Sequence, residues 1–147
     1  MGVSLAGTDV VLDLTAEVER VLWDFDALRT ADRPIRVQVG SDGRVILRGP
    51  ARSRFVRDQI LELVRAVPGV AEVIDHIIAD PELEVRVAEA LALAPRTASL
   101  TPGSVLVHCR YGAVILTGQL PPGTDREAVV QVARGVPGVV QVDDRLT

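Results

Sequence analysis

Apolar residues recur along the first half of the chain at two different spacings. From residue 15 to residue 28 they recur every three or four positions, which predicts a helix with Thr15 as its N-cap. Residues 35–39 alternate between apolar and polar, residues 45–47 are all apolar, and Gly43 lies in the turn between them. This arrangement predicts a β-hairpin, because glycine tolerates the positive φ that a tight turn needs.

A second helix and a third strand are predicted after the hairpin. Gly49 and the proline that follows it mark the end of the returning strand. Ser53 is placed to cap a helix whose apolar residues extend to Val67, and Pro68 ends that helix. The apolar residues between 70 and 74 then predict a strand. The predicted order is helix, hairpin, helix, strand.

The whole pattern occurs twice. Moving the sequence by 69 positions aligns residues 43–77 with residues 112–146 without a gap, and 13 of the 35 aligned residues are identical. Such self-similarity indicates two copies of one structural unit, which we place at residues 13–79 and 80–147. Residues 1–12 have no counterpart in the second copy, and we expect Val10, Val11 and Leu12 to add a short strand or to pack against the first unit.

The second copy differs locally from the first. Asp80 is expected to cap its first helix, with Pro81 at the first helical position, where a missing N–H is tolerated. Thr124 and Glu127 are three residues apart and predict a capping box at the start of the last helix. The strand over residues 105–109 places its apolar side chains on one face only if the hairpin turn is one residue shorter than in the first copy.

Composition limits the kinds of protein that this can be. The 147 residues are 48% hydrophobic, and the 16 basic residues, all arginine, stand against 20 acidic ones for a net charge of −4. One cysteine excludes an intrachain disulfide framework. No apolar run reaches the roughly 20 residues of a membrane span, and the N-terminus lacks the pattern of a signal peptide. We therefore expect a soluble protein of the cytoplasm, or of the periplasm or envelope if the sequence is trimmed from a longer one.

Each unit is small for an independent domain. A chain of about 65 residues buries only about 60% of its surface when it folds alone. We therefore expect the two copies to pack against each other, or the protein to oligomerise. Trp23 follows the helical spacing and is expected in the core or between the copies.

Side chains that could carry catalysis or bind a metal are few. His108 and Cys109 are neighbours in a predicted strand and so point to opposite faces, which excludes a nucleophile–base pair. Cys109 is instead expected to be a small buried side chain. The two histidines and the cysteine lack the spacing of a zinc site, and no P-loop, hydrolase or metalloprotease motif is present. We expect no enzyme activity, no metal site and no cofactor.

Arginines break the symmetry between the two copies. Five of them lie between residues 44 and 57 with no acidic residue before Asp58, and the second copy keeps only one at the aligned positions. One interpretation is a patch that binds anionic headgroups, since each cation near a charged membrane contributes about 1 kcal/mol. The other is a solvated rim of ion pairs within the protein, which contributes little. The candidate residues are Arg44, Arg48, Arg52, Arg54 and Arg57.

A glycine-based motif recurs in both copies. It consists of Gly-x-Val-x-Leu-x-Gly in the hairpin, followed after the helix by Val-x-Gly-Val-x-x-Val-x-Asp. We interpret its glycines as structural, because they lie at turns and strand ends. They are Gly43, Gly49 and Gly69 in the first copy, and Gly112, Gly118 and Gly138 in the second.

This motif, present twice, resembles that of the BON domain family, and the tandem arrangement is similar to osmotically inducible periplasmic proteins of bacteria. The resemblance implies an α/β sandwich of αββαβ order in each unit, with the helices on one face of a small mixed sheet. It also implies binding of phospholipid or another envelope surface without catalysis.

The leading hypothesis is therefore a non-enzymatic binding module for phospholipid or another anionic surface. The alternatives are a protein–protein adaptor or self-assembly module, and a small cytoplasmic sensor of an ion or solute. A nucleic-acid partner is not expected, because the chain is acidic and only 3% aromatic.

Overall fold

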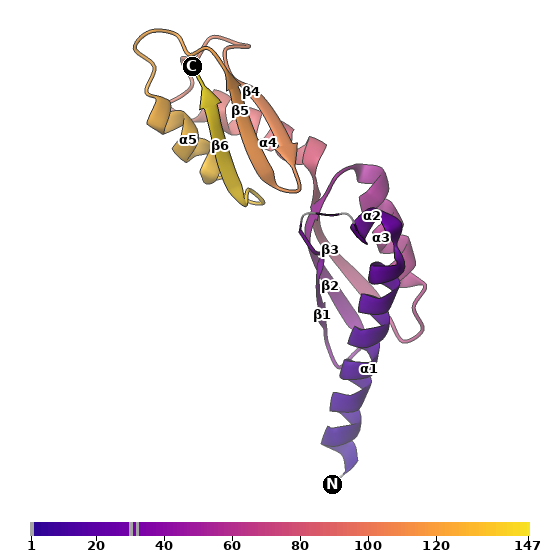
Figure 1. Ribbon diagram of the computed structural model, residues 1–147. Coiled ribbons are helices and arrows are strands. Elements are labelled where there is room, and N and C mark those ends of the chain that lie inside the picture. Colours follow the sequence, from indigo (N-terminus) through magenta and orange to yellow (C-terminus); the bar gives the residue numbers. More distant parts are fainter. Residues whose placement is uncertain (1, 30, 32) are drawn as a thin grey trace. The chain divides into compact units, whose positions relative to one another are not determined.

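The computed structural model describes residues 2–29, 31 and 33–147, with side chains described from residue 11 onward. The chain divides into two compact units, Met1–Ile77 and Ile78–Thr147. Each unit is a three-stranded mixed sheet packed with helices, as Figure 1 shows, which confirms the predicted fold class. No helix in the described part of the chain is long and apolar enough to cross a bilayer.

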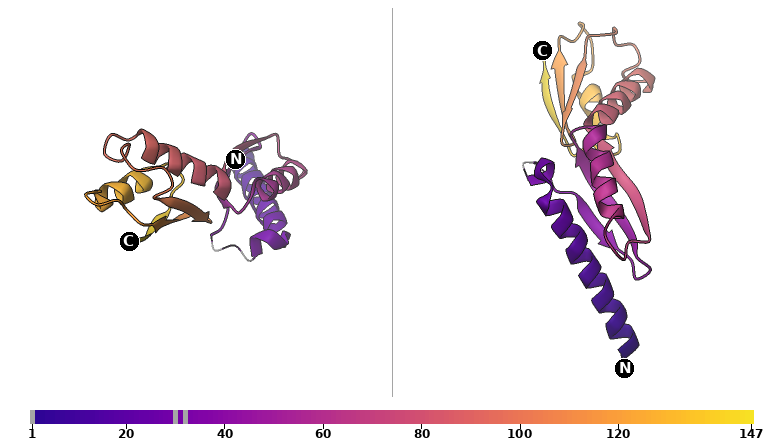
Figure 2. Two further views of the ribbon diagram at one scale, coloured as in Figure 1. Left: turned by 90° about the horizontal axis from the view of Figure 1, so that it is seen from above. Right: turned by 90° about the vertical axis from the view of Figure 1, so that its right-hand side faces the viewer.

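The first unit has its strands in the order β1-β2-β3, so that β1 is an outer strand and β2 is central. β1 pairs with β2 in antiparallel fashion, with Val37 opposite Leu47. Figure 1 shows α1 and α3 on the same side of this sheet, and both figures show the N-terminal part of α1 extending past the β1–β2 turn (Figures 1 and 2). The elements are α1 (Gly2–Asp24), α2 (Asp26–Arg29), β1 (Arg36–Val39), β2 (Arg44–Ala51), α3 (Arg54–Arg65) and β3 (Glu72–Ala79).

The core of the first unit lies between the sheet and its helices. α1 contributes Val18 and β2 contributes Val45 and Leu47, all with no exposed surface. Ile60 and Val64 of α3 complete the contact. Because side chains alternate along a strand, the residues of β2 between these buried positions face away from the helices.

Of the two alternatives for residues 10–12, the short strand was wrong. α1 begins at Gly2, so residues 2–12 are helical rather than a strand, and Thr15 lies inside the helix and caps nothing. Its Oγ1 instead donates a hydrogen bond to the Val11 carbonyl at 2.7 Å. Val11, Leu14 and Val18 continue the helical spacing upstream, and this periodicity outweighs the strand preference of the adjacent valines. Residue 1 lies outside the described residues.

Two predicted strand boundaries were also wrong. β2 continues through Gly49 and the following proline to Ala51, because Gly49 takes a φ of 141° that keeps the strand extended. β3 begins at Glu72 rather than at residue 70, because Val70 still bonds back to the end of the helix, with its N–H 3.2 Å from the Val67 carbonyl. The predicted N-cap at Ser53 is confirmed.

The second unit repeats the design, with strands in the order β4-β5-β6. β4 is antiparallel and β6 parallel to the central β5. The β4–β5 turn consists of Tyr111 and Gly112, one residue shorter than the turn over residues 41–43, as predicted. The elements are α4 (Asp80–Leu93), β4 (Leu106–Arg110), β5 (Ala113–Gly118), α5 (Arg126–Arg134) and β6 (Gln141–Leu146).

Both cap predictions in the second unit were wrong. Ala79 occupies the N-cap position of α4 without a side-chain bond, and Asp80 is already inside the helix. At the last helix the cap is Asp125, whose side chain accepts a hydrogen bond from the Ala128 N–H at 3.1 Å, so Thr124 lies one residue too early for a capping box. An aspartate one position later provides the same acceptor at the residue where the chain turns helical.

Candidate functional site

Two arginines face each other on the sheet surface of the first unit that the helices leave open. Arg36 of β1 is the register partner of Arg48 of β2, and both are exposed. Directly opposed side chains on antiparallel strands have their Cβ atoms about 5 Å apart, and like charges there are destabilising. Within the described residues, neither arginine has a carboxylate partner. The pair therefore concentrates positive charge, with no counter-ion among the residues that the structure describes.

Neighbouring side chains on this open face are mixed, since Gln38 and the acidic Glu72 lie on it together with aliphatic residues and a histidine. Ile46 lies on β2 between the exposed arginines 44 and 48 and is half-buried. On β3, Ile74 is half-buried and His76 is exposed, whereas Ile77 is buried toward the helices. The open face thus combines aliphatic surface with cationic side chains.

The other predicted arginines have partners within the protein. The Arg44 Nε lies 3.2 Å from Glu72 Oε2. Arg57 is on α3, across the sheet from the open face, and its Nε lies 4.0 Å from Asp75 Oδ2. Arg52 and Arg54, at the start of α3, each also make an interaction within the chain.

Only Arg44 and Arg48 of the predicted cluster share the open face, and Arg36 joins them. The sequence alone did not point to Arg36, because the run of five arginines begins at residue 44 and Arg36 lies on the preceding strand. Extending the hairpin register outward from its turn would have placed Arg36 opposite Arg48.

The repeated arginine and aspartate of the two copies form an ion pair between a helix and the last strand of each unit. Arg126 donates from Nε to Asp144 Oδ2 at 2.8 Å and from a terminal nitrogen to Oδ1 at 3.1 Å, joining α5 to β6. These hydrogen bonds hold the pKa of the Asp144 carboxyl below its ordinary value. Arg57 and Asp75 occupy the matching positions in the first unit. Arg57 therefore has a structural partner.

The six motif glycines all have positive φ, between 80° and 141°. At Gly118, an added Cβ would lie 2.1 Å from the Ser104 carbonyl oxygen, so the close approach of two backbone segments requires glycine. The glycines position the strands of each unit.

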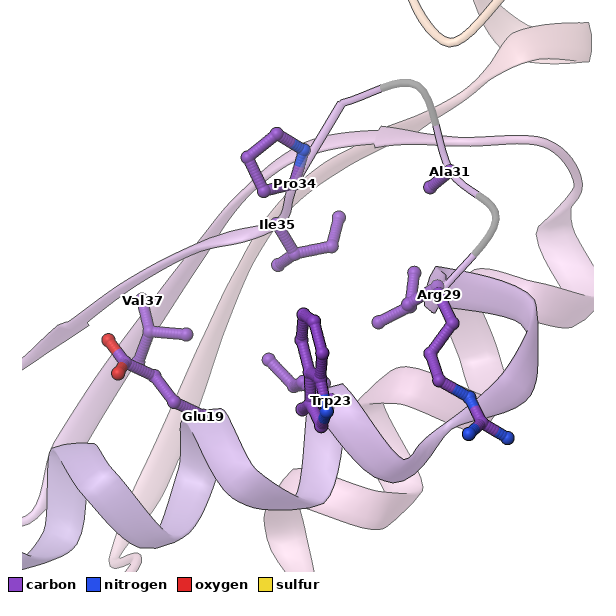
Figure 3. A pocket seen from close by; sticks show the side chains of 9 residues that line it. Glu19, Trp23, Arg29, Ala31, Pro34, Ile35 and Val37 are labelled. Atoms are coloured by element: carbon purple, nitrogen blue, oxygen red, sulfur yellow. The ribbon is translucent and has the colours of Figure 1, made fainter.

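A groove runs between α1 and the outer strand β1. Trp23 stands in it below Ile35, with Glu19 and Val37 on one side and Arg29 on the other (Figure 3). The groove has a volume of about 270 Å³. Trp23 was expected in the core or between the copies; the core placement was wrong, because 73% of its surface is exposed and it belongs to neither hydrophobic core.

Two carboxylates of α4 bind main-chain groups of the β4–β5 hairpin. Asp80 is only 2% exposed and accepts from the N–H groups of Tyr111 at 2.8 Å and Gly112 at 3.1 Å. Glu84 Oε1 accepts from the Cys109 N–H at 2.9 Å. Sequence reasoning missed both roles, because it assigned Asp80 to a helix cap.

Cys109 is a buried side chain, as predicted. It has no exposed surface, and burial together with the charges of Glu84 and Asp80 raises the pKa of its thiol to about 12. His108 is exposed on the other face of the strand. Among the described residues, no group of three or more His, Cys, Asp or Glu side chains is placed to hold a metal ion.

Comparisons with known proteins agree with this architecture. The model of the BON domain matches residues 13–81 and again residues 79–147. No curated protein matches the chain. Among solved structures, the C-terminal domain of CdsD, a structural protein of the Type III secretion system of Chlamydia trachomatis, is similar with a TM-score of 0.66 at 17% identity. That match covers 92% of this chain and 64% of the other. A second CdsD structure from this organism gives a TM-score of 0.43 at 16% identity and covers 91% of each chain.

Proposed function

Because the chain belongs to the BON domain family, with two domains in tandem, we propose that it is a binding protein that docks on anionic phospholipid surfaces through the open sheet face of its first unit. The family is generally non-catalytic. The observation that carries the proposal is the opposed pair Arg36 and Arg48, which places two positive charges side by side with no carboxylate partner in the described part of the chain.

An anionic headgroup would relieve the repulsion between these two guanidinium groups. Arginine presents several N–H donors in a planar fork that suits phosphate oxygens. Ile46 and Ile74 on the same face offer aliphatic contact beside the charges. A phospholipid surface supplies both parts, since acyl chains lie next to phosphate groups.

Vesicle sedimentation tests the proposal. The whole chain is mixed with phosphatidylglycerol vesicles or with phosphatidylcholine vesicles at low and high salt. We expect binding only to the anionic vesicles, and weakening by salt. The double variant Arg36→Gln and Arg48→Gln should bind about 30-fold more weakly, since each cation contributes about 1 kcal/mol.

The matched control is the double variant Arg65→Gln and Arg134→Gln. It removes the same charge from exposed sites at the ends of α3 and α5. An equal loss of vesicle binding in the control would show that only net charge matters, and the assignment to the open face would then be wrong. Absence of binding to anionic vesicles at low salt would overturn the proposal altogether.

The alternative is a module that assembles with protein. The fold is shared with a domain of CdsD, which is described as a structural protein of a secretion system. Light scattering at increasing protein concentration distinguishes this alternative, because self-assembly raises the mass while vesicle binding leaves it unchanged.

A further inference from the structure

The outer strand of the first unit has unpaired main-chain groups. The Gly40 N–H donates to the Arg44 carbonyl at 2.8 Å, so Gly40 points toward β2. In an antiparallel pair the direction alternates, and the N–H and C=O of Val37 and Val39 therefore point away from β2. No hydrogen-bond partner for either residue occurs in the described part of the chain. Such an edge is a template for another strand.

The corresponding edge of the second unit is covered at one position, whereas Val107, which matches Val37, has no hydrogen-bond partner in the described part of the chain. Cys109 of β4 occupies the position of Val39, and its outward N–H donates to Glu84 of α4. The residue aligned with Glu84 in α1 is Thr15, which is too short to reach the strand and bonds to its own helix instead. One substitution between the copies thus separates the bonded outward N–H of Cys109 from that of Val39, which has no partner among the described residues.

A groove follows the same edge in both units, which shows that it is built by the fold. In the first unit Leu22, Trp23 and Val37 line it. In the second unit the equivalent residues Leu91, Ala92 and Val107 line a groove of about 310 Å³. The first unit alone places an exposed indole there, beside the open strand (Figure 3).

We propose that the first unit binds an extended segment of a partner protein, which adds as a fourth strand to β1 and places an apolar side chain in the groove against Trp23. A peptide main chain has donors and acceptors at the two-residue spacing that Val37 and Val39 require. This inference goes beyond lipid binding: it adds the main chain of β1 and the indole, and it shares only Arg36 with the surface proposed for phospholipid.

Charge defines the partner further. The side chains of an added strand alternate between the groove and the open face, where Arg36 is exposed and opposed by Arg48. Acidic residues on that face of the partner strand would neutralise Arg36. The segment is therefore one that alternates acidic and apolar residues. A second copy of β1 does not fit, because its own residues on this face are Arg36 and Gln38.

Trp23 supplies the readout, because it is the single tryptophan of the chain and is exposed. The probe is a synthetic peptide in which glutamate and valine alternate, and the control peptide has lysine in place of each glutamate. We expect a saturable blue shift of the indole emission with the acidic peptide only. No shift together with no change in the anisotropy of the labelled peptide would overturn the proposal, as would equal binding of the lysine peptide.

A reciprocal pair of variants tests strand addition itself. Thr15→Glu places in α1 the carboxylate that closes the second unit, and should weaken peptide binding about tenfold by occupying the Val39 N–H. Glu84→Thr opens the other edge and should leave the Trp23 signal unchanged. If Thr15→Glu folds and binds the peptide as well as the parent does, strand addition is wrong.

Amide exchange gives a measurement that needs no variant. Peptide binding should slow the exchange of the Val37 and Val39 amides, and unchanged exchange at saturation would contradict the proposal. A blue shift that grows with protein concentration alone, together with a doubled mass, would show that a second copy occupies the edge and would also overturn it. The variant Arg48→Gln keeps the edge intact, so vesicle binding and peptide binding can fail separately.

Discussion

β1 and β4 hold the same place at the outer edge of the two sheets, yet their outward main chains have different surroundings. Glu84 accepts a hydrogen bond from the outward N–H of Cys109 on β4, and Asp80 accepts from the two residues of the turn that follows. The aligned residues of α1 are Thr15 and Val11, and neither offers a carboxylate. An edge strand is normally protected against unwanted pairing. The difference shows that a duplicated unit can keep its fold while one copy loses the cover of its edge.

The tight contact at Gly118 should give the largest effect. An added Cβ would lie 2.1 Å from the Ser104 carbonyl oxygen in the second unit, but 3.1 Å from the Pro34 carbonyl oxygen at the equivalent Gly49. We expect Gly118→Ala to reduce the free energy of unfolding by more than about 3 kcal/mol. The backbone at Ser104 must move to make room for the methyl group, and alanine is strained at this positive φ. Gly49→Ala should reduce the free energy of unfolding by a smaller amount. Urea denaturation of both variants measures this, and a larger loss for Gly49→Ala would contradict it.

Removal of the Asp80 carboxylate tests the closed hairpin directly. Asp80→Ala leaves the Tyr111 and Gly112 N–H groups without their acceptor, and we expect a loss of about 2–4 kcal/mol in unfolding free energy. The matched variant in the first unit is Val11→Ala, which removes no main-chain acceptor and should cost less. Equal losses in urea denaturation would mean that the carboxylate adds nothing to the hairpin.

The reactivity of the Cys109 thiol measures how well this side chain of β4 is buried. Its pKa of about 12 means that almost no thiolate forms at pH 8, so a thiol reagent should react with the unfolded protein and not with the native one. A thiol whose pKa is raised by folding favours the native state fully at pH values below its unfolded pKa of about 8.5. Stability should therefore fall as the pH rises from there toward 12, and Cys109→Ala should remove this part of the decline. Rapid native labelling at pH 8 would contradict the burial.

Removal of the Arg126–Asp144 ion pair between α5 and β6 should have the smallest effect on stability. Because Arg126 lowers the pKa of Asp144, the ionised carboxylate stabilises the fold above about pH 4, and this contribution is lost as the pH falls through the lowered value. Asp144→Asn should reduce stability slightly at pH 7 and flatten its decline in acid. Asp75→Asn is the matched variant, and urea denaturation at pH 3 to 7 compares the two. If the stability of Asp144→Asn falls with decreasing pH just as that of the parent does, the Arg126–Asp144 ion pair is not a source of acid sensitivity.

The fold was predictable because its signals are local and occur twice. The repeat, the hairpin around Gly43 and the cap at Ser53 all depend on residues close in sequence. The true start of α1 was missed because Thr15 has the chemistry of a cap whether or not the helix ends there. The role of Asp80 was missed because its partners are more than 30 residues away.

The candidate site was predictable only in part. The arginines are visible in the sequence, but their partners depend on pairing between strands. Arg44 and Arg48 look equivalent along the chain, and only the fold shows that one faces Glu72 and the other faces Arg36. The exposure of Trp23 was likewise unpredictable, since helical periodicity does not say how far the sheet extends over each turn of the helix.

β3 ends at Ala79 and α4 begins at Asp80, with no residue between them. Both residues at this junction are almost fully inaccessible. Separate expression of the halves requires both fragments to keep residues 79–81, the stretch that the two family matches share.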